Sequence, residues 1–144
     1  MIPVLLAVAL YRVVVAPPRY SIVLADHGSE LRSICGLDTK ACTHILGSAV
    51  HADCTGTGEH WHATLDVSFV PYIYIGDWSL RFMLIAHEHE HLLDLDDAAE
   101  RFARDASQVD YRSRERCEAD APRLSVVLQG TLETAAAESM KLRR

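Results

Sequence analysis

Residues 80–105 read LRFMLIAHEHEHLLDLDDAAERFARD, and this segment carries the clearest structural signal in the chain. Ser79 is a residue type that commonly caps a helix, so we expect the helix to begin just after it. The first two turns are almost wholly apolar apart from Arg81, which predicts that this half is buried. The later Asp, Glu and Arg side chains predict emergence into solvent. A long, half-buried helix therefore organises the predicted fold.

Within this helix, residues 87–91 read HEHEH and satisfy the pattern H-E-x-x-H. Two histidines four residues apart on a helix share a face, so His87 and His91 can bind one ion. Glu88 lies about 100° further round, where a carboxylate can take a proton from zinc-bound water, whereas His89 projects about 200° away. The spacing predicts a zinc-dependent hydrolase with Glu88 as general base. A solvated helix surface with paired charges is the alternative interpretation.

A catalytic zinc ion takes three protein ligands and keeps one open position, so a third ligand is needed. Asp97 lies six residues after His91, a spacing that other H-E-x-x-H sites use after a glycine turn, but Asp94 occupies the place of that glycine. Asp94 is about 10 Å along the helix from His87, so it is better suited to fixing a ring nitrogen or supporting the last helix. Glu133, on a separate helix, is the third candidate.

Strand signals lie on the N-terminal side of the motif. Residues 64–75, TLDVSFVPYIYI, are rich in β-branched and aromatic types, and Pro71 divides them into two strands or bends one edge strand. Residues 43–63 are rich in Gly, Thr, Ser and His, which predicts turns or a weak hairpin closed by Cys54. Residues 21–25 are expected to form a short strand.

Weaker signals flank these segments. Residues 29–34 are expected to form a helical turn. Residues 123–128, RLSVVL, predict another strand that Gly130 ends. Thr131 would then cap a final helix over residues 132–142.

The N-terminus begins with an apolar run, residues 2–10, of the length of a signal-peptide core, with Ala16 as a cleavage point. Arg12 keeps the continuous apolar stretch well short of the roughly 20 residues that span a bilayer, so no stable membrane span is expected. A basic leader is missing, and a buried strand is the alternative. We expect a signal peptide or apolar segment over residues 1–16 and one domain over residues 17–144.

The four cysteines are Cys35, Cys42, Cys54 and Cys117, and no C-x-x-C spacing occurs among them. Two disulfides are therefore expected, with three possible pairings, and they require an oxidising compartment. We accordingly expect a secreted or periplasmic protein. A net charge of −6 without a basic block, apart from the short C-terminal tail, argues against sequence-independent nucleic-acid binding. The expected partner is a peptide or protein substrate.

The segments over roughly residues 64–140 resemble small bacterial proteins assigned as zinc metallopeptidases of the H-E-x-x-H type. The matching pieces are residues 87–91, an acidic residue three positions later at Asp94, and residues 132–137, LETAAA, where leucine replaces the family's phenylalanine. The resemblance implies a Glu-type zincin that uses Zn²⁺, with Glu133 as third ligand.

The fold expected from all these signals is α+β and zincin-like. A small sheet covers the active-site helix, and a C-terminal helix brings Glu133 toward His87 and His91. Two other classes of protein remain open on the sequence alone. One is a non-catalytic zinc-binding or regulatory module, and the other is a disulfide-stabilised secreted interaction domain.

Overall fold

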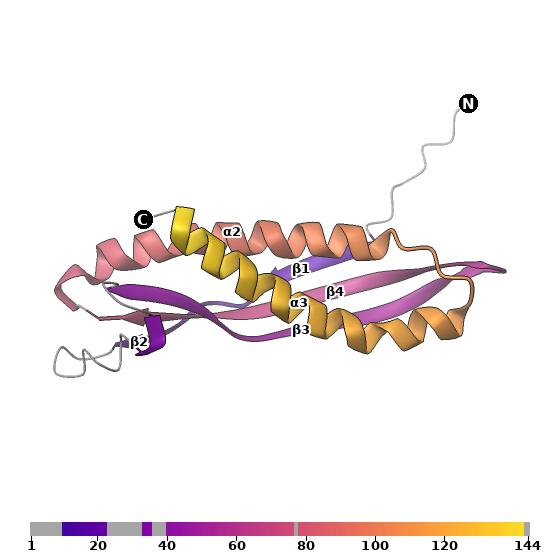
Figure 1. The fold of residues 1–144 in the computed structure, drawn as a ribbon, viewed down its shortest axis with the longest axis horizontal. Helices are drawn as coiled ribbons and strands as arrows, with labels where there is room; N and C mark the ends of the chain where they lie inside the picture. The colour runs from indigo at the N-terminus through magenta and orange to yellow at the C-terminus, as the bar shows by residue number, and fades with distance from the viewer. Residues whose placement is uncertain (1–9, 23–32, 36–39, 77, 143–144) are drawn as a thin grey trace, which may run out of the picture.

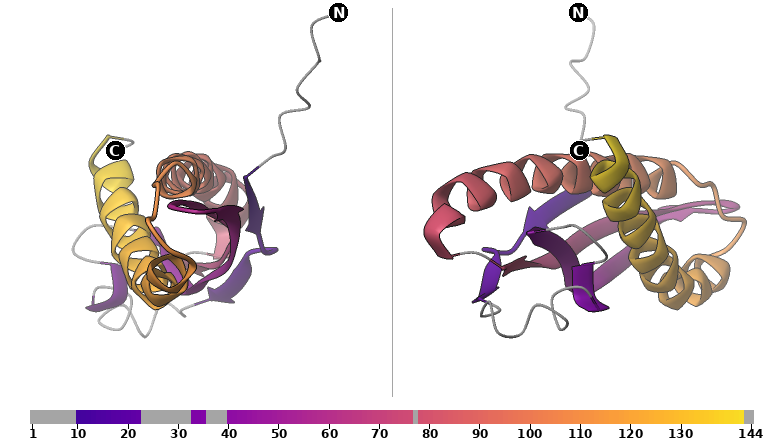
Figure 2. Two further views of the ribbon diagram at one scale, coloured as in Figure 1. Left: turned by 90° about the vertical axis from the view of Figure 1, so that its right-hand side faces the viewer. Right: turned by 60° about the vertical axis from the view of Figure 1, so that its left-hand side comes forward.

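The computed structural model describes residues 10–22, 33–35, 40–76 and 78–142. A four-stranded sheet packs against two long helices, which confirms the expected α+β class (Figure 1). In chain order the elements are β1 (Tyr11–Val15), β2 (Arg19–Ile22), β3 (Ala41–Thr57), β4 (His60–Ile75), the 3-10 turn η2 (Trp78–Leu80), α2 (Arg81–Ser107) and α3 (Arg114–Leu142). Both helices lie on the same side of the sheet, as Figure 2 shows from two directions.

Strand β4 is the centre of the sheet. Strand β3 pairs with one of its edges in antiparallel fashion, and β1 and β2 pair in succession with the other edge, both parallel. Alternate residues of β4 are buried, as expected for a strand with one face on the core. The strand predicted over residues 64–75 is therefore confirmed and extends further, but the expectation that Pro71 divides it or makes it an edge strand is wrong, because β4 is continuous and paired on both sides. Residues 43–63 form long strands joined by a tight turn at Gly58, where φ is +60°, rather than a weak hairpin.

Pro71 lies in the middle of β4 without ending the strand. Strand β3 carries one extra residue, Leu46, directly beside it. On the other edge, residues 16–18 between β1 and β2 pass residues 70–71 of β4, which is again one residue too many. Proline has no N–H to give to a ladder, and bulges are where sheets tolerate it. Because both neighbours bulge here, each strand keeps the same face toward the helices on both sides of Pro71.

The core lies between β4 and the two helices. Apolar side chains from all three elements form one cluster: Ala63, Leu65, Val67 and Phe69 from β4, Leu95, Ala99 and Ala103 from α2, and Leu124, Leu128 and Leu132 from α3. A disulfide between Cys54 and Cys117 joins β3 to the first turns of α3, and a second one joins Cys35 to Cys42. Both expected disulfides are present, and they point to an oxidising environment outside the cytoplasm.

Helix α2 matches its predicted range, but two expectations about its start are wrong. The residue preceding the helix is Leu80, which makes no capping side-chain hydrogen bond, and Ser79 lies inside the 3-10 turn. The first two turns are not buried, since Phe82 is 75% and Met83 63% exposed. Phe82 lies about 240° around the helix from the buried Glu88, so an apolar side chain there points away from the sheet.

The strand predicted at residues 123–128 and the helix start at Thr131 are also wrong, because α3 continues through both. The buried residues of α3 recur at helical spacing: Cys117, Leu124, Leu128, Leu132 and Ser139. The packing of this apolar face against the sheet outweighs the local β propensity of Val126 and Val127. Both valines are exposed and do not belong to the buried face. The Thr131 hydroxyl donates to the Val127 carbonyl one turn back instead of capping a helix.

The N-terminal segment divides at residue 10. Tyr11–Val15 is a strand of the sheet, paired with Leu65 to Phe69, so cleavage after Ala16 would remove β1. The apolar run at residues 1–9 lies outside the described residues. Of the strand expected over residues 21–25, the first two residues belong to β2 and the rest lie outside the described residues. Of the helical turn expected over residues 29–34, residues 33 and 34 are helical and residues 29–32 lie outside the described residues. In the described part of the chain, none of the helices combines the length and apolarity needed to cross a bilayer.

Candidate metal centre

The histidines of the H-E-x-x-H motif lie side by side on α2, where the helix passes the C-terminal end of α3. The Nε2 atoms of His87 and His91 are 3.2 Å apart, and their rings meet edge to face. Two imidazole nitrogens that bind one tetrahedral zinc ion at about 2.0–2.1 Å are separated by about 3.3–3.4 Å. His87 is exposed and His91 is buried. The pair therefore fits a single divalent ion reached from the His87 side.

Glu88 completes the group. One ligand atom each from His87, Glu88 and His91 all lie within 4.8 Å of one another. Among the described residues, no other group of three metal-ligating side chains comes this close together. Glu88 is 2% exposed and faces the sheet, where Thr43 Oγ1 donates a hydrogen bond of 2.6 Å to its Oε2. The carboxylate is thus held against β3, next to the histidine pair. It can act there as a proton acceptor or as a metal ligand.

His91 is anchored through its other ring nitrogen. Its Nδ1 lies 2.6 Å from the hydroxyl of Ser139, a buried residue of α3. Ser139 in turn donates a hydrogen bond to Asp94 on α2. Neither Thr43 nor Ser139 is part of a recognisable sequence motif, and each lies more than 40 residues from its partner. The sequence interpretation missed both residues for that reason.

The three candidates for a third ligand lie outside the histidine group. Glu133 is exposed, and its carboxylate accepts a hydrogen bond of 2.9 Å from Gln129 Nε2. Asp97 is exposed on α2 and borders a small cavity of about 140 Å³. Asp94 accepts a hydrogen bond from the Ser139 hydroxyl, which also contacts His91. The structure brings together His87, Glu88 and His91, and it does not bring Glu133 into this group.

The other histidines serve different neighbours. His89, expected to point away from the metal, is exposed and lies 3.1 Å from the Tyr20 hydroxyl on β2 through its Nε2. His60 Nδ1 lies 2.9 Å from a carboxylate oxygen of Asp110, at the turn of the β3–β4 hairpin. His62 lies beside the same carboxylate at 3.9 Å, and the pKa of Asp110 is lowered chiefly by the His60 hydrogen bond. These residues stay away from the metal centre.

A second polar network lies near the start of α3. The Tyr111 hydroxyl donates to Asp120, and Arg123 donates to both oxygens of the same carboxylate. The Arg123 hydrogen bond, followed by that of Tyr111, lowers the pKa of Asp120 to about 2. Burial, followed by the Asp120 carboxylate, raises the pKa of Tyr111 to about 12. Tyr111 also pairs through its backbone with Trp61 of β4, so this network fixes the connection between α2 and α3.

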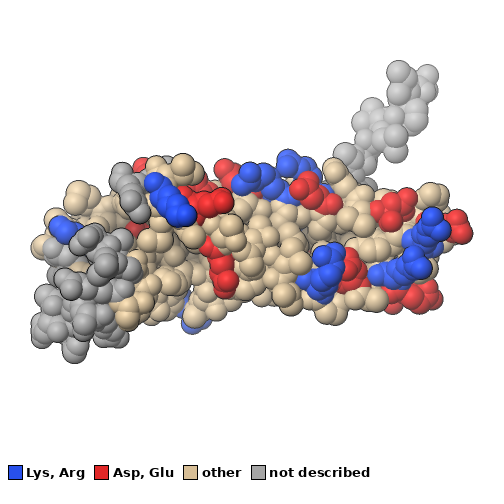
Figure 3. Space-filling view, in the orientation of Figure 1, with Lys and Arg blue, Asp and Glu red and all other residues tan. Residues whose placement is uncertain are grey.

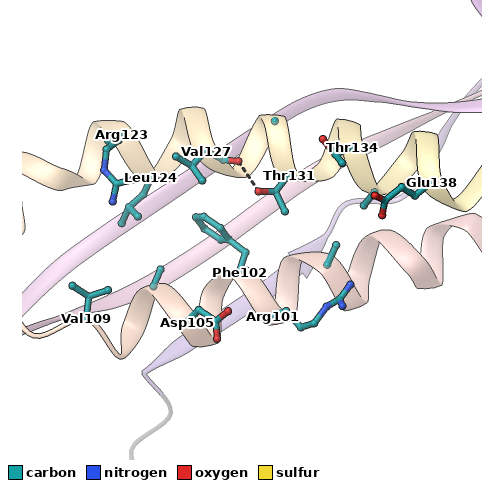
Figure 4. A pocket seen from close by; sticks show the side chains of 14 residues that line it. Arg101, Phe102, Asp105, Val109, Arg123, Leu124, Val127, Thr131, Thr134 and Glu138 are labelled. Carbon is teal, nitrogen blue, oxygen red and sulfur yellow. Dashed lines mark hydrogen bonds between the residues drawn. The ribbon is translucent and has the colours of Figure 1, made fainter.

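A groove of about 910 Å³ runs between α2 and α3 (Figure 4). Phe102, Leu124 and Val127 line it with apolar surface, and charged residues such as Arg101 and Glu138 stand at its sides. Figure 3 shows the same face with acidic and basic side chains around an uncharged band. The two histidines of the metal centre are not part of its lining.

Comparison of the chain with protein-family models, with curated proteins and with solved structures finds no match in any of the three. The likeness to H-E-x-x-H metallopeptidases therefore rests on the His87, Glu88 and His91 group itself.

Proposed function

We propose that this protein is a zinc-dependent hydrolase that cleaves peptide bonds, with His87 and His91 as metal ligands and Glu88 as the general base. One observation carries the proposal: the two Nε2 atoms lie 3.2 Å apart on adjacent turns of one helix, with a carboxylate beside them. A charged helix surface would not require such a pairing, because solvated side chains at this spacing do not need to converge.

A bound zinc ion would supply Lewis acidity, which polarises a carbonyl group and lowers the pKa of a water molecule. Glu88 would hold the proton taken from that water and pass it to the leaving amine. Because Thr43 donates to Oε2 of Glu88, we assign the proton to Oε1. Because the ring of His87 is exposed, a metal ion or a substrate can reach the histidine pair from solvent. The buried ring of His91 contacts α3 on the other side.

Glu133 remains our prediction for the third ligand. In that role its carboxylate would have to leave Gln129, its hydrogen-bond donor in the structure. Glu133→Gln separates the two outcomes, because a ligand substitution weakens zinc binding strongly whereas an exposed surface residue does not affect it. Zinc affinity unchanged in Glu133→Gln would leave Glu88 as the acidic ligand nearest the histidine pair.

Zinc content and zinc affinity test the metal site directly. We expect one zinc ion per chain in the purified wild type, and loss of that ion in His87→Ala and His91→Ala. His89→Ala is the matched control, since it removes a third imidazole from the same HEHEH run but one that contacts Tyr20. A wild type that binds no zinc, or a His89→Ala variant that loses it equally, contradicts the assignment.

Hydrolysis of an unfolded protein substrate tests the reaction. Glu88→Gln keeps the size of the side chain and the acceptor for Thr43, so we expect zinc to be retained and turnover to fall by 10²- to 10⁴-fold, as for loss of a general base.

A non-catalytic zinc-binding module is the second candidate, and the 2% exposure of Glu88 favours it. In that case Glu88 is a ligand, the zinc-loaded wild type hydrolyses nothing, and Glu88→Gln weakens zinc binding instead.

A further inference from the structure

Ser139 joins the two long helices at the back of the metal centre. Its hydroxyl lies 2.6 Å from His91 Nδ1 and also donates to the Asp94 carboxylate. The side chain is buried, with Ser139 2% exposed, in a helix whose other buried residues are apolar apart from the disulfide cysteine. Burying a hydroxyl is favourable only when its hydrogen bonds are made. The serine therefore has a specific role at this position, which an apolar residue could not fill.

The directions of these hydrogen bonds fix a proton. A serine hydroxyl has one hydrogen, and Ser139 gives it to Asp94. The contact between Ser139 and His91 must then run the other way, with Nδ1–H of His91 as donor and the serine oxygen as acceptor. In a neutral imidazole the remaining nitrogen carries a lone pair. That nitrogen is Nε2, the atom that faces His87.

We propose that Ser139 and Asp94 are positioning residues that hold His91 in its Nδ1–H tautomer, so that the C-terminal end of α3 prepares Nε2 to bind the metal. The inference rests on the proposed function for its use, because a ligand nitrogen must present a lone pair. The hydroxyl that contacts both His91 and Asp94 comes from a different helix, so α3 takes part in orienting the ring.

Nuclear magnetic resonance of the metal-free protein with ¹⁵N-labelled histidine tests the tautomer, at about pH 8, where ordinary imidazoles are neutral. We expect the wild-type His91 to be in the Nδ1–H form. In Ser139→Ala the bridge is lost, so we expect the Nε2–H form to become populated. Ser139→Thr retains a hydroxyl and should restore the wild-type form. Asp94→Asn keeps both Ser139 and its volume and should shift the tautomer in the same direction as Ser139→Ala.

Zinc affinity, measured by competition with a chelator, gives a second result for the same variants. Residues that orient a ligand histidine typically change affinity by about 10- to 100-fold, and we expect this loss in Ser139→Ala and Asp94→Asn. Ser125→Ala is the matched control, because Ser125 is another serine of α3 but contacts the backbone of Val50 in β3. That variant should bind zinc as the wild type does.

The two measurements separate this inference from the proposed function. A wild type whose His91 is in the Nδ1–H form but which binds no zinc contradicts the hydrolase proposal and leaves the tautomer assignment intact. A wild-type His91 with its proton on Nε2, or a folded Ser139→Ala protein with unchanged tautomer and unchanged zinc affinity, overturns the inference. Circular dichroism identifies any variant that fails to fold, and Asp94→Asn then provides the deciding measurement.

Discussion

The two ends of the molecule hold their polar side chains in different ways. The hairpin end comprises residues 54–63 and 106–124, and the metal end comprises residues 40–46, 84–94 and 136–142 (Figure 1). At the hairpin end, a disulfide and backbone pairs support an exposed-to-half-buried cluster around Asp120. At the metal end, hydroxyl groups from other elements contact the buried side chains of Glu88 and His91.

This difference separates stability from function. The hairpin end combines several independent restraints, so losing one polar contact there leaves the others in place. At the metal end, the hydroxyl groups of Thr43 and Ser139 contact the buried side chains of Glu88 and His91, and the Cys35–Cys42 disulfide precedes Thr43 in the chain. Buried polar groups are favourable only while every partner is present. We therefore expect substitutions at the hairpin end to change global stability and those at the metal end to change the site as well.

The largest expected effect is the loss of stability when a disulfide is removed, and it tests whether the hairpin end is the more strongly restrained one. Cys54–Cys117 closes a loop with a sequence separation of 63, and Cys35–Cys42 one of 7. Loop-closure entropy predicts losses of about 4 and about 2 kcal/mol when each pair is replaced by alanine. Urea unfolding of the two double variants measures both values. Equal losses would show that the hairpin end is not the more strongly restrained one.

Thr43→Val sharpens the comparison from the other side. It keeps the volume of the side chain but removes the donor to the buried Glu88 carboxylate. An unsatisfied buried acceptor costs about 1–3 kcal/mol, and we expect this loss in urea unfolding at pH 7. Thr131→Val is the control, because that hydroxyl bonds a carbonyl of its own helix. Equal stability of the two variants would mean that Glu88 does not depend on Thr43.

Asp120→Asn tests the hairpin end through its pH dependence. The folded pKa of Asp120, about 2, is below the ordinary value of about 3.9, so the charged form stabilises the fold above about pH 4 and loses this effect as pH falls toward 2. Because Arg123 is largely exposed, we expect a loss of about 1–2 kcal/mol at pH 7. The difference from wild type should shrink below pH 4. Asp105→Asn is the control, because its carboxylate is 77% exposed and its loss should cost less at pH 7.

Arg12→Ala has the smallest expected effect. Arg12 pairs with Asp66 on the outer face of the sheet, with side chains 73% and 53% exposed. Exposed ion pairs of this kind contribute little, so the loss should stay below about 0.5 kcal/mol and vanish in high salt. Thermal unfolding at two salt concentrations measures it. A loss above 1 kcal/mol would place part of the stability on β1, away from both ends.

Local geometry explains what the sequence could predict. The helix over residues 80–105 and the convergence of His87 with His91 follow from the helical repeat, and the strand at residues 64–75 from its composition. The prediction failed where long-range packing decides. Residues 123–128 have β-type composition, yet the apolar face of α3 against the sheet makes them helical.

The hydrogen-bond partners of Glu88 and His91 could not be predicted from the sequence for a related reason. A threonine in a strand and a serine in a helix carry no pattern that marks them as partners of Glu88 and His91. Thr43 reaches Glu88 because β3 curls toward α2, and Ser139 reaches His91 because α3 returns toward α2 (Figure 2). Glu133 was favoured by resemblance to other proteins, whereas the side chain that α3 presents to His91 is Ser139, six positions later.

The parallel pairing of β1 with β4 has a consequence for the order of folding. The β3–β4 hairpin closes through a two-residue turn and forms from neighbouring residues, which is fast. Strand β1 must find residues more than 50 positions later in the chain, and α3 must return to α2 over a similar distance. We expect these steps to follow hairpin formation. The pair of imidazoles would then become competent for zinc only in the last stage of folding, after the helix that carries Ser139 has docked.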